Sequence, residues 1–230
     1  QLDTASHSHL GALHKRMNSG DKVDLLAAYK KAKTRLILLD YDGTLHGFSQ
    51  SLSTLAAKPS ARLISQLCRI AARSGTTLCI VSGRPKRVLE SWFKDCPELM
   101  LVAEHGAWVR SQGTWKQQVQ AADLSEVLNL MKNYASRTAG SFVEAKETAA
   151  VWHYRRVNHE MAYVRKANLV HELQGIVEGT SLGVYKGTKI IEVKPKSLTK
   201  REIAKELIDN HPSEFVFCAG DDVSDEEMFE

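Results

Sequence analysis

The chain has 230 residues, of which 43% are hydrophobic and 25% are charged, as in an ordinary soluble globular protein with a real core. Its net charge of +4 comes from scattered lysines and arginines, which argues against a nucleic-acid partner and leaves small anionic substrates compatible. No segment approaches the roughly 18 apolar residues of a membrane span, so we expect no membrane partner. The length favours one large domain or a core that carries an inserted module.

The start of the chain and its cysteines bear on its compartment. Residues 1–20 form a polar lead-in or linker without the apolar region of a signal peptide and without an initiating methionine. We therefore expect the sequence to begin inside a longer polypeptide. The four cysteines contain no CxxC pair, and we expect them to be reduced packing residues of a cytoplasmic protein.

Residues 21–107 are expected to form the first part of an α/β core. A helix over 23–33 precedes Leu36 to Leu39, four apolar residues that run without polar alternation into Asp40. Such a run is typical of a parallel-sheet strand that is covered on both faces. Because parallel sheets bind ligands at the carboxyl ends of their strands, Asp40 is expected at the mouth of a site.

The next elements repeat this pattern. A helix over 62–74 is followed by a strand over 77–81, and a third apolar run covers 99–103. Strand, helix and strand, with each strand ending in a polar turn, is the order of a doubly wound, Rossmann-like fold with a parallel sheet.

The middle of the chain has a different character. From 108 to 187, short alternating segments surround amphipathic helices near 124–137 and 163–177. This pattern predicts a smaller α+β domain inserted into the sheet domain. From 188 to 230 the core pattern returns, beginning with a strand over 190–193, so we expect these residues to form the second part of the core.

Two acids follow the first strand. Asp40 and Asp42 stand one residue apart, and crowding two carboxylates at a dry strand end costs several kcal/mol unless a positive group joins them. Mg²⁺ is the natural candidate, because it accepts one or two protein carboxylates and takes its other oxygens from water and phosphate. The alternative is an Asp-rich turn in which Asp42 and Gly43 cap the strand and Asp40 is solvated.

Three further polar motifs occur at the starts or ends of expected elements. Ser82-Gly83-Arg84 follows the second strand, Lys200 opens a helix, and a loop with several aspartates, 220–225, follows the last strand. Phosphoryl transfer needs such groups: a carboxylate nucleophile, an acid/base, a hydroxyl and amides for the phosphoryl oxygens, and an ammonium that neutralises their charge.

In this order the motifs resemble those of the haloacid dehalogenase superfamily of magnesium-dependent phosphatases, from about Tyr29 to the last residue. The resemblance implies a doubly wound core with an inserted cap. It implies that Asp40 is the nucleophile, Asp42 the general acid/base, Ser82 a phosphoryl-binding residue and Lys200 the neutralising cation. It also implies a Mg²⁺ site formed by Asp40, the main-chain carbonyl of Asp42 and Asp221, with Asp222 and Asp225 in support or with Asp225 orienting Lys200.

Longer strings resemble a narrower family. Segments 101–107, 143–156, 189–195 and 220–229 look like those of the trehalose-6-phosphate phosphatase family, as in fungal enzymes and fused synthase–phosphatase chains. In that family the inserted domain is a mobile cap whose acids and bases grip the sugar hydroxyls. The resemblance gives these candidates for substrate contacts: Gly83, Arg84, Glu104, His105, Glu144, Lys146, Arg155, Lys189 and Glu192.

The residues themselves support some of these candidates better than others. Glu144 and Lys146 have the same parity on a strand-like segment and so share a face, which suits a polar sugar. Their alternative is a solvated ion pair on an outward face. Arg155 is equally compatible with an outward position beside Arg156.

Other candidates have alternatives too. His105 is as compatible with orienting its own turn as with touching substrate, and Lys189 and Glu192 flank a buried strand, where one can simply satisfy the other. Trp152 and His153 fit packing residues of the cap better than ligands.

The expected function is Mg²⁺-dependent hydrolysis of trehalose 6-phosphate to trehalose and phosphate through an aspartyl-phosphate, with cap closure excluding water. The expected partner is a sugar phosphate, and fusion to or association with a trehalose-6-phosphate synthase is the expected protein context. Two alternatives stay open: a related sugar phosphatase of the same fold, and a non-catalytic sugar-phosphate-sensing domain fused to a glycosyltransferase. Arg201, where the family usually has glycine, and an expected C-terminal truncation at Glu230 keep the second open, whereas the intact acids favour an enzyme.

Overall fold

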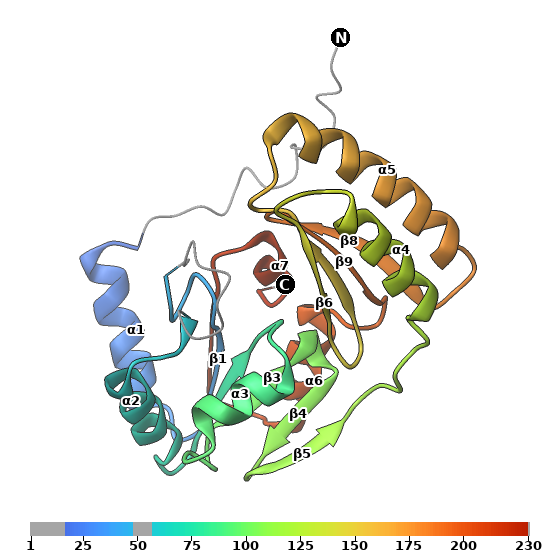
Figure 1. The fold of residues 1–230 in the computed structure, drawn as a ribbon. Helices are drawn as coiled ribbons and strands as arrows, with labels where there is room; N and C mark the ends of the chain where they lie inside the picture. Colours follow the sequence, from blue (N-terminus) through green and yellow to red (C-terminus); the bar gives the residue numbers. More distant parts are fainter. Residues whose placement is uncertain (1–16, 48–56, 230) are drawn as a thin grey trace.

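The computed structural model describes residues 17–47 and 57–229. Its strands form two sheets, a six-stranded sheet in the order β10-β1-β2-β3-β4-β5 and a four-stranded sheet in the order β6-β7-β9-β8 (Figure 1). The strands are β1 Arg35–Asp40, β2 Thr76–Val81, β3 Met100–Ala103, β4 Trp108–Ser111, β5 Thr114–Gln117, β6 Phe142–Ala145, β7 Ala150–His153, β8 Leu182–Gly187, β9 Ile190–Pro195 and β10 Phe215–Ala219. The helices are α1 Ser19–Lys31, α2 Ala61–Ala71, α3 Lys86–Phe93, α4 Ser125–Ser136, α5 His159–Val177, α6 Lys200–Asn210 and α7 Val223–Glu226.

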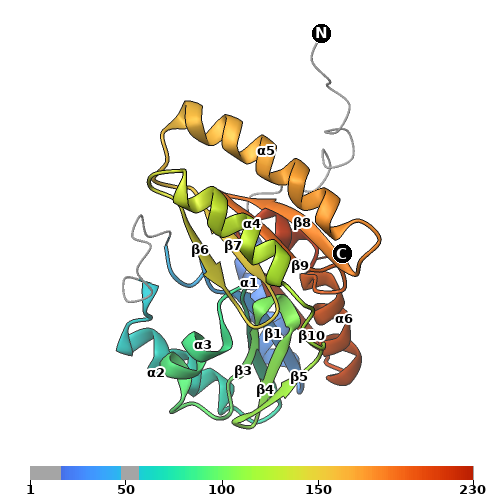
Figure 2. The same ribbon diagram turned by 45° about the vertical axis from the view of Figure 1, so that its right-hand side comes forward.

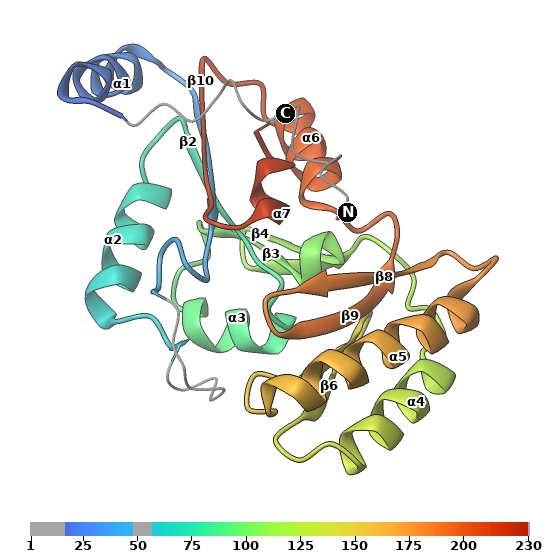
Figure 3. The ribbon, with the colours of Figure 1, turned by 90° about the horizontal axis from the view of Figure 1, so that it is seen from above.

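The six-stranded sheet is the core of a doubly wound fold. Strands β10, β1, β2 and β3 are parallel, whereas β4 and β5 are antiparallel. Helices α2 and α3 cover one face and α6 covers the other (Figure 3). Leu36 and Leu38 of β1 pack on the α6 side, while Ile37 and Leu39 pack on the opposite side. The continuous apolar run of β1 is therefore explained by burial on both faces, as predicted.

The four-stranded sheet belongs to the cap. All its pairings are antiparallel, and α4 and α5 lie along its outer face (Figure 2). Trp152, Met131 and Leu169 are fully buried between this sheet and the two helices. The sheet's other face is turned toward the core. The predicted α/β core with a separate α+β cap is confirmed.

The sheets differ from the expected boundaries in two places. Strands β4 and β5 lie within the segment expected to belong to the cap, but they extend the core sheet from β3 through an antiparallel hairpin. Gln112 and Gly113 at its tip both have positive φ, 48° and 77°, as a tight two-residue turn requires. Short alternating strands look alike in either sheet, so the sequence pattern could not show which sheet this hairpin joins.

Strand β9 is the second difference. It was expected to begin the second part of the core, but it is an inner strand of the cap sheet, between β7 and β8. Ile191 and Val193 are buried in the cap's own hydrophobic cluster, while Glu192 and Lys194 are buried on the opposite side. The apolar residues Ile190, Ile191 and Val193 look alike in a buried strand of either sheet, which explains the wrong assignment.

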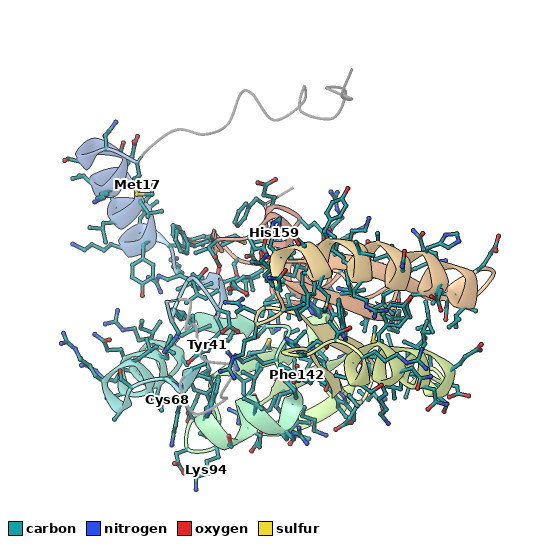
Figure 4. All side chains as sticks on the ribbon, turned by 45° about the horizontal axis from the view of Figure 1, so that its top comes forward. Met17, Tyr41, Cys68, Lys94, Phe142 and His159 are labelled. Atoms are coloured by element: carbon teal, nitrogen blue, oxygen red, sulfur yellow. A yellow bond between two sulfur atoms is a disulfide. The ribbon has the colours of Figure 1, made fainter. Side chains whose placement is uncertain are left out.

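Helix α1 forms where the sequence predicts it but contributes little to the core. The predicted helix over 23–33 corresponds to α1, but α1 buries none of its residues, and it lies at the periphery, where Met17 precedes it (Figure 4).

Two of the four cysteines form a disulfide. Cys68 of α2 and Cys96 are joined, with their Cα atoms 5.5 Å apart. The expectation of four reduced cysteines is wrong for this pair, which is 28 residues apart in sequence and adjacent only in the fold.

None of the helices in the described part of the chain is long and apolar enough to cross a membrane.

Candidate active site

Asp40, at the carboxyl end of β1, lies in a buried charge cluster. Lys200 Nζ donates to Oδ1 of Asp40 at 2.7 Å and to Oδ1 of Asp225 at 2.5 Å. Burial raises the pKa of Asp40 to about 6, against the opposing effect of Lys200. Burial alone lowers the pKa of Lys200, but the Asp40 and Asp225 carboxylates outweigh it and hold that pKa above its ordinary value. One ammonium therefore faces two carboxyl groups in a dry setting.

The position of Lys200 follows from its helix. Lys200 is the first residue of α6, and the side chain of Thr199 caps the helix by accepting a hydrogen bond from the amide of Glu202. The buried Ile203 and Leu207 fix the helix against the core sheet.

Three carboxylates are placed to hold a metal ion. Asp40, Asp221 and Asp225 each offer one oxygen, and these oxygens lie within 4.8 Å of one another. Oδ2 of Asp40 is buried and has no hydrogen-bond partner among the described residues, which is costly unless a cation satisfies it. An all-oxygen donor set beside a solvent-exposed Asp221 suits Mg²⁺. The residues present therefore fit the ion that the sequence implies.

The loop that carries Asp221 is held by Asp225. Oδ2 of Asp225 accepts hydrogen bonds from the amides of Asp221 and Asp222 at 3.1 and 3.0 Å. Burial raises the pKa of Asp221, and nearby Asp225 adds to the shift. Asp225 thus both orients Lys200 and shapes the acidic loop, while Asp222 lines the cavity described below.

Gly43 makes a specific prediction about this acidic site. Its φ is +95°, and a Cβ atom there would lie 2.1 Å from Oδ2 of Asp221. We expect Gly43→Ala to displace Asp221 and to weaken Mg²⁺ binding by roughly 10- to 100-fold, so that a higher Mg²⁺ concentration is required for half-saturation. Gly47→Ala is the matched control, because a Cβ atom there meets no atom of the described residues within 4 Å. Equal Mg²⁺ requirements in the two variants would contradict the prediction.

Asp42 is held by Arg84 rather than by the acidic cluster. Arg84 Nε and Nη2 donate to the two carboxylate oxygens of Asp42 at 2.7 and 2.6 Å. The guanidinium lies over the ring of Trp92, 4.9 Å from its centroid, and 5.7 Å from that of Tyr41. The Asp42 side chain is therefore turned toward the cavity, so its main-chain carbonyl, and not its carboxylate, would bind a metal ion here.

The loop after β2 packs against the turn after β3. Ser82 is buried, and its Oγ accepts a hydrogen bond from the amide of Arg84 at 3.2 Å. A Cβ atom on Gly83 would lie 2.6 Å from the ring of His105, so glycine allows this ring to approach the loop. Burial lowers the pKa of His105.

The cap contributes charged residues in pairs. Lys146 Nζ donates to Oε1 of Glu192 at 2.8 Å, and His105 Nε2 lies 3.2 Å from Oε2 of the same residue. Burial opposes ionisation of Glu192, but Lys146 and His105 hold its pKa well below the ordinary value. Glu144 pairs with His153 at 3.0 Å, and this hydrogen bond lowers the pKa of Glu144. Glu144 and Lys146 thus do not pair with each other on an outward face.

A cavity of about 610 Å³ lies between the core and the cap. Its lining includes these residues expected at the site: Asp42, Gly83, Arg84, His105, Glu144, Lys146, Arg155, Glu192 and Asp222. Arg155 therefore points to the cavity and not outward. Two of the substrate-contact candidates do not line it. Glu104 is buried beneath it, and Lys189 lies in the β8–β9 turn, beside a separate small pocket with Tyr154 and Lys166.

Several residues at this site were missed by the sequence analysis. Arg87 and Phe142 line the cavity, and His153 does so too, stacked on Phe142 with ring centroids 4.4 Å apart, although it was expected to pack. Trp152, by contrast, is packed in the cap core as predicted. Thr148 donates two hydrogen bonds to Glu104. No sequence pattern could have indicated this contact, because the two residues meet only in the folded protein.

Comparisons with known proteins agree with this geometry. A family model described as trehalose-phosphatase matches residues 38–230. A bifunctional trehalose-6-phosphate synthase/phosphatase of Thermoproteus tenax is 39% identical over 209 residues, covering 90% of this chain and 28% of the relative. A trehalose-phosphatase of Zygosaccharomyces rouxii is 34% identical over 252 residues, covering 99% of this chain and 28% of the relative. The chain thus spans about a quarter of the length of the curated relatives that it matches.

Solved structures are also similar to this chain. The C-terminal domain of Candida albicans trehalose-6-phosphate phosphatase is similar with a TM-score of 0.81 and 32% identity, covering 91% of this chain and 77% of that one. A haloacid dehalogenase-like hydrolase from Bacteroides thetaiotaomicron shares the fold, with a TM-score of 0.60 at 17% identity over 85% of each chain. By its matched sequence, the chain belongs to the trehalose-phosphatase family, and its fold is that of a haloacid dehalogenase-like hydrolase.

Proposed function

We propose that this protein is a Mg²⁺-dependent phosphatase that hydrolyses trehalose 6-phosphate through an aspartyl-phosphate on Asp40. The observation that carries the proposal is the buried Asp40 carboxylate, with one oxygen held by Lys200 and the other without a hydrogen-bond partner among the described residues. A carboxylate held in this way is ready to act on a phosphoryl group. The charged cavity lies between the core and the cap.

In the first step, an oxygen of Asp40 attacks the phosphorus, and the bond from phosphorus to the sugar oxygen breaks. Asp42 donates a proton to that oxygen, for which one of its oxygens must first leave Arg84. In the second step, Asp42 takes a proton from water, whose oxygen attacks the phosphorus and releases phosphate from Asp40. Ser82 and Lys200 contact the phosphoryl oxygens throughout. Asp40, Asp221 and Asp225 would hold Mg²⁺, which would supply further positive charge during phosphoryl transfer.

The cavity supports a sugar ester as substrate. Its volume of about 610 Å³ is within the range of pockets for small molecules. The cap side of the cavity is lined by both acidic and basic side chains. Glu144 and Glu192 offer acceptors to sugar hydroxyls, and Lys146 and Arg155 offer donors. The relatives whose names include trehalose-phosphatase support trehalose 6-phosphate in particular. The fused relatives support a working context with a trehalose-6-phosphate synthase.

The test is phosphate release from trehalose 6-phosphate, glucose 6-phosphate and 4-nitrophenyl phosphate, each with Mg²⁺ or with EDTA. We expect release from trehalose 6-phosphate to be fastest, to require Mg²⁺ and to fall at least about 1,000-fold in Asp40→Asn, as expected for loss of a nucleophile. Asp209→Asn, at an exposed position on α6, is the matched control.

The other outcomes identify the rival functions. Similar rates with all three esters would keep a phosphatase and reject the specific substrate. No release from a folded sample that still binds trehalose 6-phosphate would reject catalysis and support a sugar-phosphate-sensing domain.

A further inference from the structure

The turn after β3 has an unusual backbone. Glu104, His105 and Gly106 have φ values of 51°, 57° and 112°. Left-handed conformation is rare for residues other than glycine, and consecutive ones persist only where the surroundings impose them. Here the surroundings are the loop after β2, which carries Ser82, Gly83 and Arg84 and is called the phosphoryl-binding loop below. The amide of Glu104 donates to the carbonyl of Arg84 at 3.1 Å, and the amide of His105 donates to the carbonyl of Ser82 at 3.2 Å.

This backbone sends the two side chains to two different elements of the cap, the turn between β6 and β7 and strand β9. Oε2 of Glu104 accepts hydrogen bonds from the amide and the hydroxyl of Thr148 at 3.0 and 2.9 Å. His105 reaches Glu192 of β9. Glu104 and Thr148 are both fully buried, 1% and 0% exposed. The contact is therefore dry, and neither residue lines the cavity.

Thr148 belongs to the turn between β6 and β7 that also carries Lys146. The amide of Lys146 donates to the carbonyl of Ala149 at 2.9 Å, which closes the turn around Thr148. Lys146 Nζ in turn pairs with Glu192. Fixing Thr148 to the core thus fixes where the Lys146 ammonium and the Glu192 carboxylate stand over the cavity.

We propose that Glu104 is a positioning residue and not a sugar contact. Its carboxylate latches the β6–β7 turn to the phosphoryl-binding loop, and Thr148 is its partner. This sets the distance between the site of phosphoryl transfer and the cap residues Lys146 and Glu192 that face the sugar. The role of the latch in sugar selection rests on the proposed phosphatase function, whereas the latch itself does not.

The first test measures the latch without any activity. Hydrogen exchange by mass spectrometry is followed in peptides covering 142–153 in the full chain. We expect Glu104→Ala and Thr148→Val to raise exchange in this segment, since the first removes both hydrogen bonds to Thr148 and the second removes the one from the Thr148 hydroxyl. Glu104→Gln, which keeps the acceptor oxygen, and Thr148→Ser, which keeps both donors, are the matched controls and should stay near wild type. Unchanged exchange in both Glu104→Ala and Thr148→Val would overturn the proposal.

The second test separates a latch from a sugar contact. We expect Glu104→Ala to lower kcat/KM for trehalose 6-phosphate by about 10-fold, the scale of one or two buried hydrogen bonds. Thr148→Val should lower it several-fold while leaving 4-nitrophenyl phosphate hydrolysis within about twofold. The double variant should be no worse than Glu104→Ala, because both changes break the same contact.

A direct sugar contact would give a different result. Thr148→Val would then behave as wild type, the double variant would show additive losses, and Glu104→Gln would lose as much as Glu104→Ala. Any of these three results would reject the latch. If the wild-type protein hydrolyses no sugar phosphate, the proposed function fails, and the exchange experiment still decides whether the latch exists.

Discussion

Lys200→Met is expected to destabilise the folded protein by about 3–5 kcal/mol and to lower phosphate release by roughly 100- to 1,000-fold. Removing the ammonium leaves the buried carboxyl groups of Asp40 and Asp225 facing each other without a counter-charge. It also removes the side chain proposed to neutralise the transferring phosphoryl group. Urea unfolding and initial rates of phosphate release, each with and without Mg²⁺, measure the two effects.

The control for this prediction is Lys205→Met, at an exposed position on the same helix. It should change unfolding free energy by less than about 0.5 kcal/mol and leave the rate near wild type. Added Mg²⁺ should restore part of the stability of Lys200→Met, because the ion offers the carboxylates another positive partner. If Lys200→Met is as stable and as active as Lys205→Met, the proposed role of the cluster is wrong.

The core part of the site was predictable because it depends on local signals. Asp40 follows an apolar strand, Lys200 follows a helix cap, and the acidic loop follows the last strand. Parallel strands bring their carboxyl ends to the same edge of the sheet, so these motifs meet without any knowledge of side-chain packing. The resemblance left Asp225 either supporting the metal site or orienting Lys200, and the structure adds that Lys200 pairs with both Asp40 and Asp225.

The cap was less predictable because its contacts are non-local. Glu104 was named as a sugar contact from its motif, but its partner Thr148 comes from a turn 44 residues away. The segment that forms β9 was assigned to the core, since its apolar residues Ile190, Ile191 and Val193 look alike in a buried strand of either sheet. Cys68 and Cys96 are likewise adjacent only after α2 and the end of α3 pack together.

The raised pKa of Asp40 predicts how stability depends on pH when Mg²⁺ is absent. Burial raises this pKa from 3.8 to about 6 in the folded protein, so between these values the folded state binds the proton more tightly than the unfolded chain does. Stability from this group is therefore fully present below about pH 4 and is lost as pH rises through 6. The difference corresponds to about 3 kcal/mol.

The measurement is urea unfolding of wild type and Asp40→Asn in EDTA from pH 4 to pH 7. We expect wild type to lose about 2.4 kcal/mol relative to the variant over this range, because asparagine has no proton to release. Asp209→Asn should follow wild type, since its side chain is exposed. Saturating Mg²⁺ should reduce the loss in wild type, because a cation beside Asp40 favours the ionised carboxylate that rising pH creates. Parallel stability profiles for wild type and Asp40→Asn in EDTA would show that burial does not raise the pKa of Asp40.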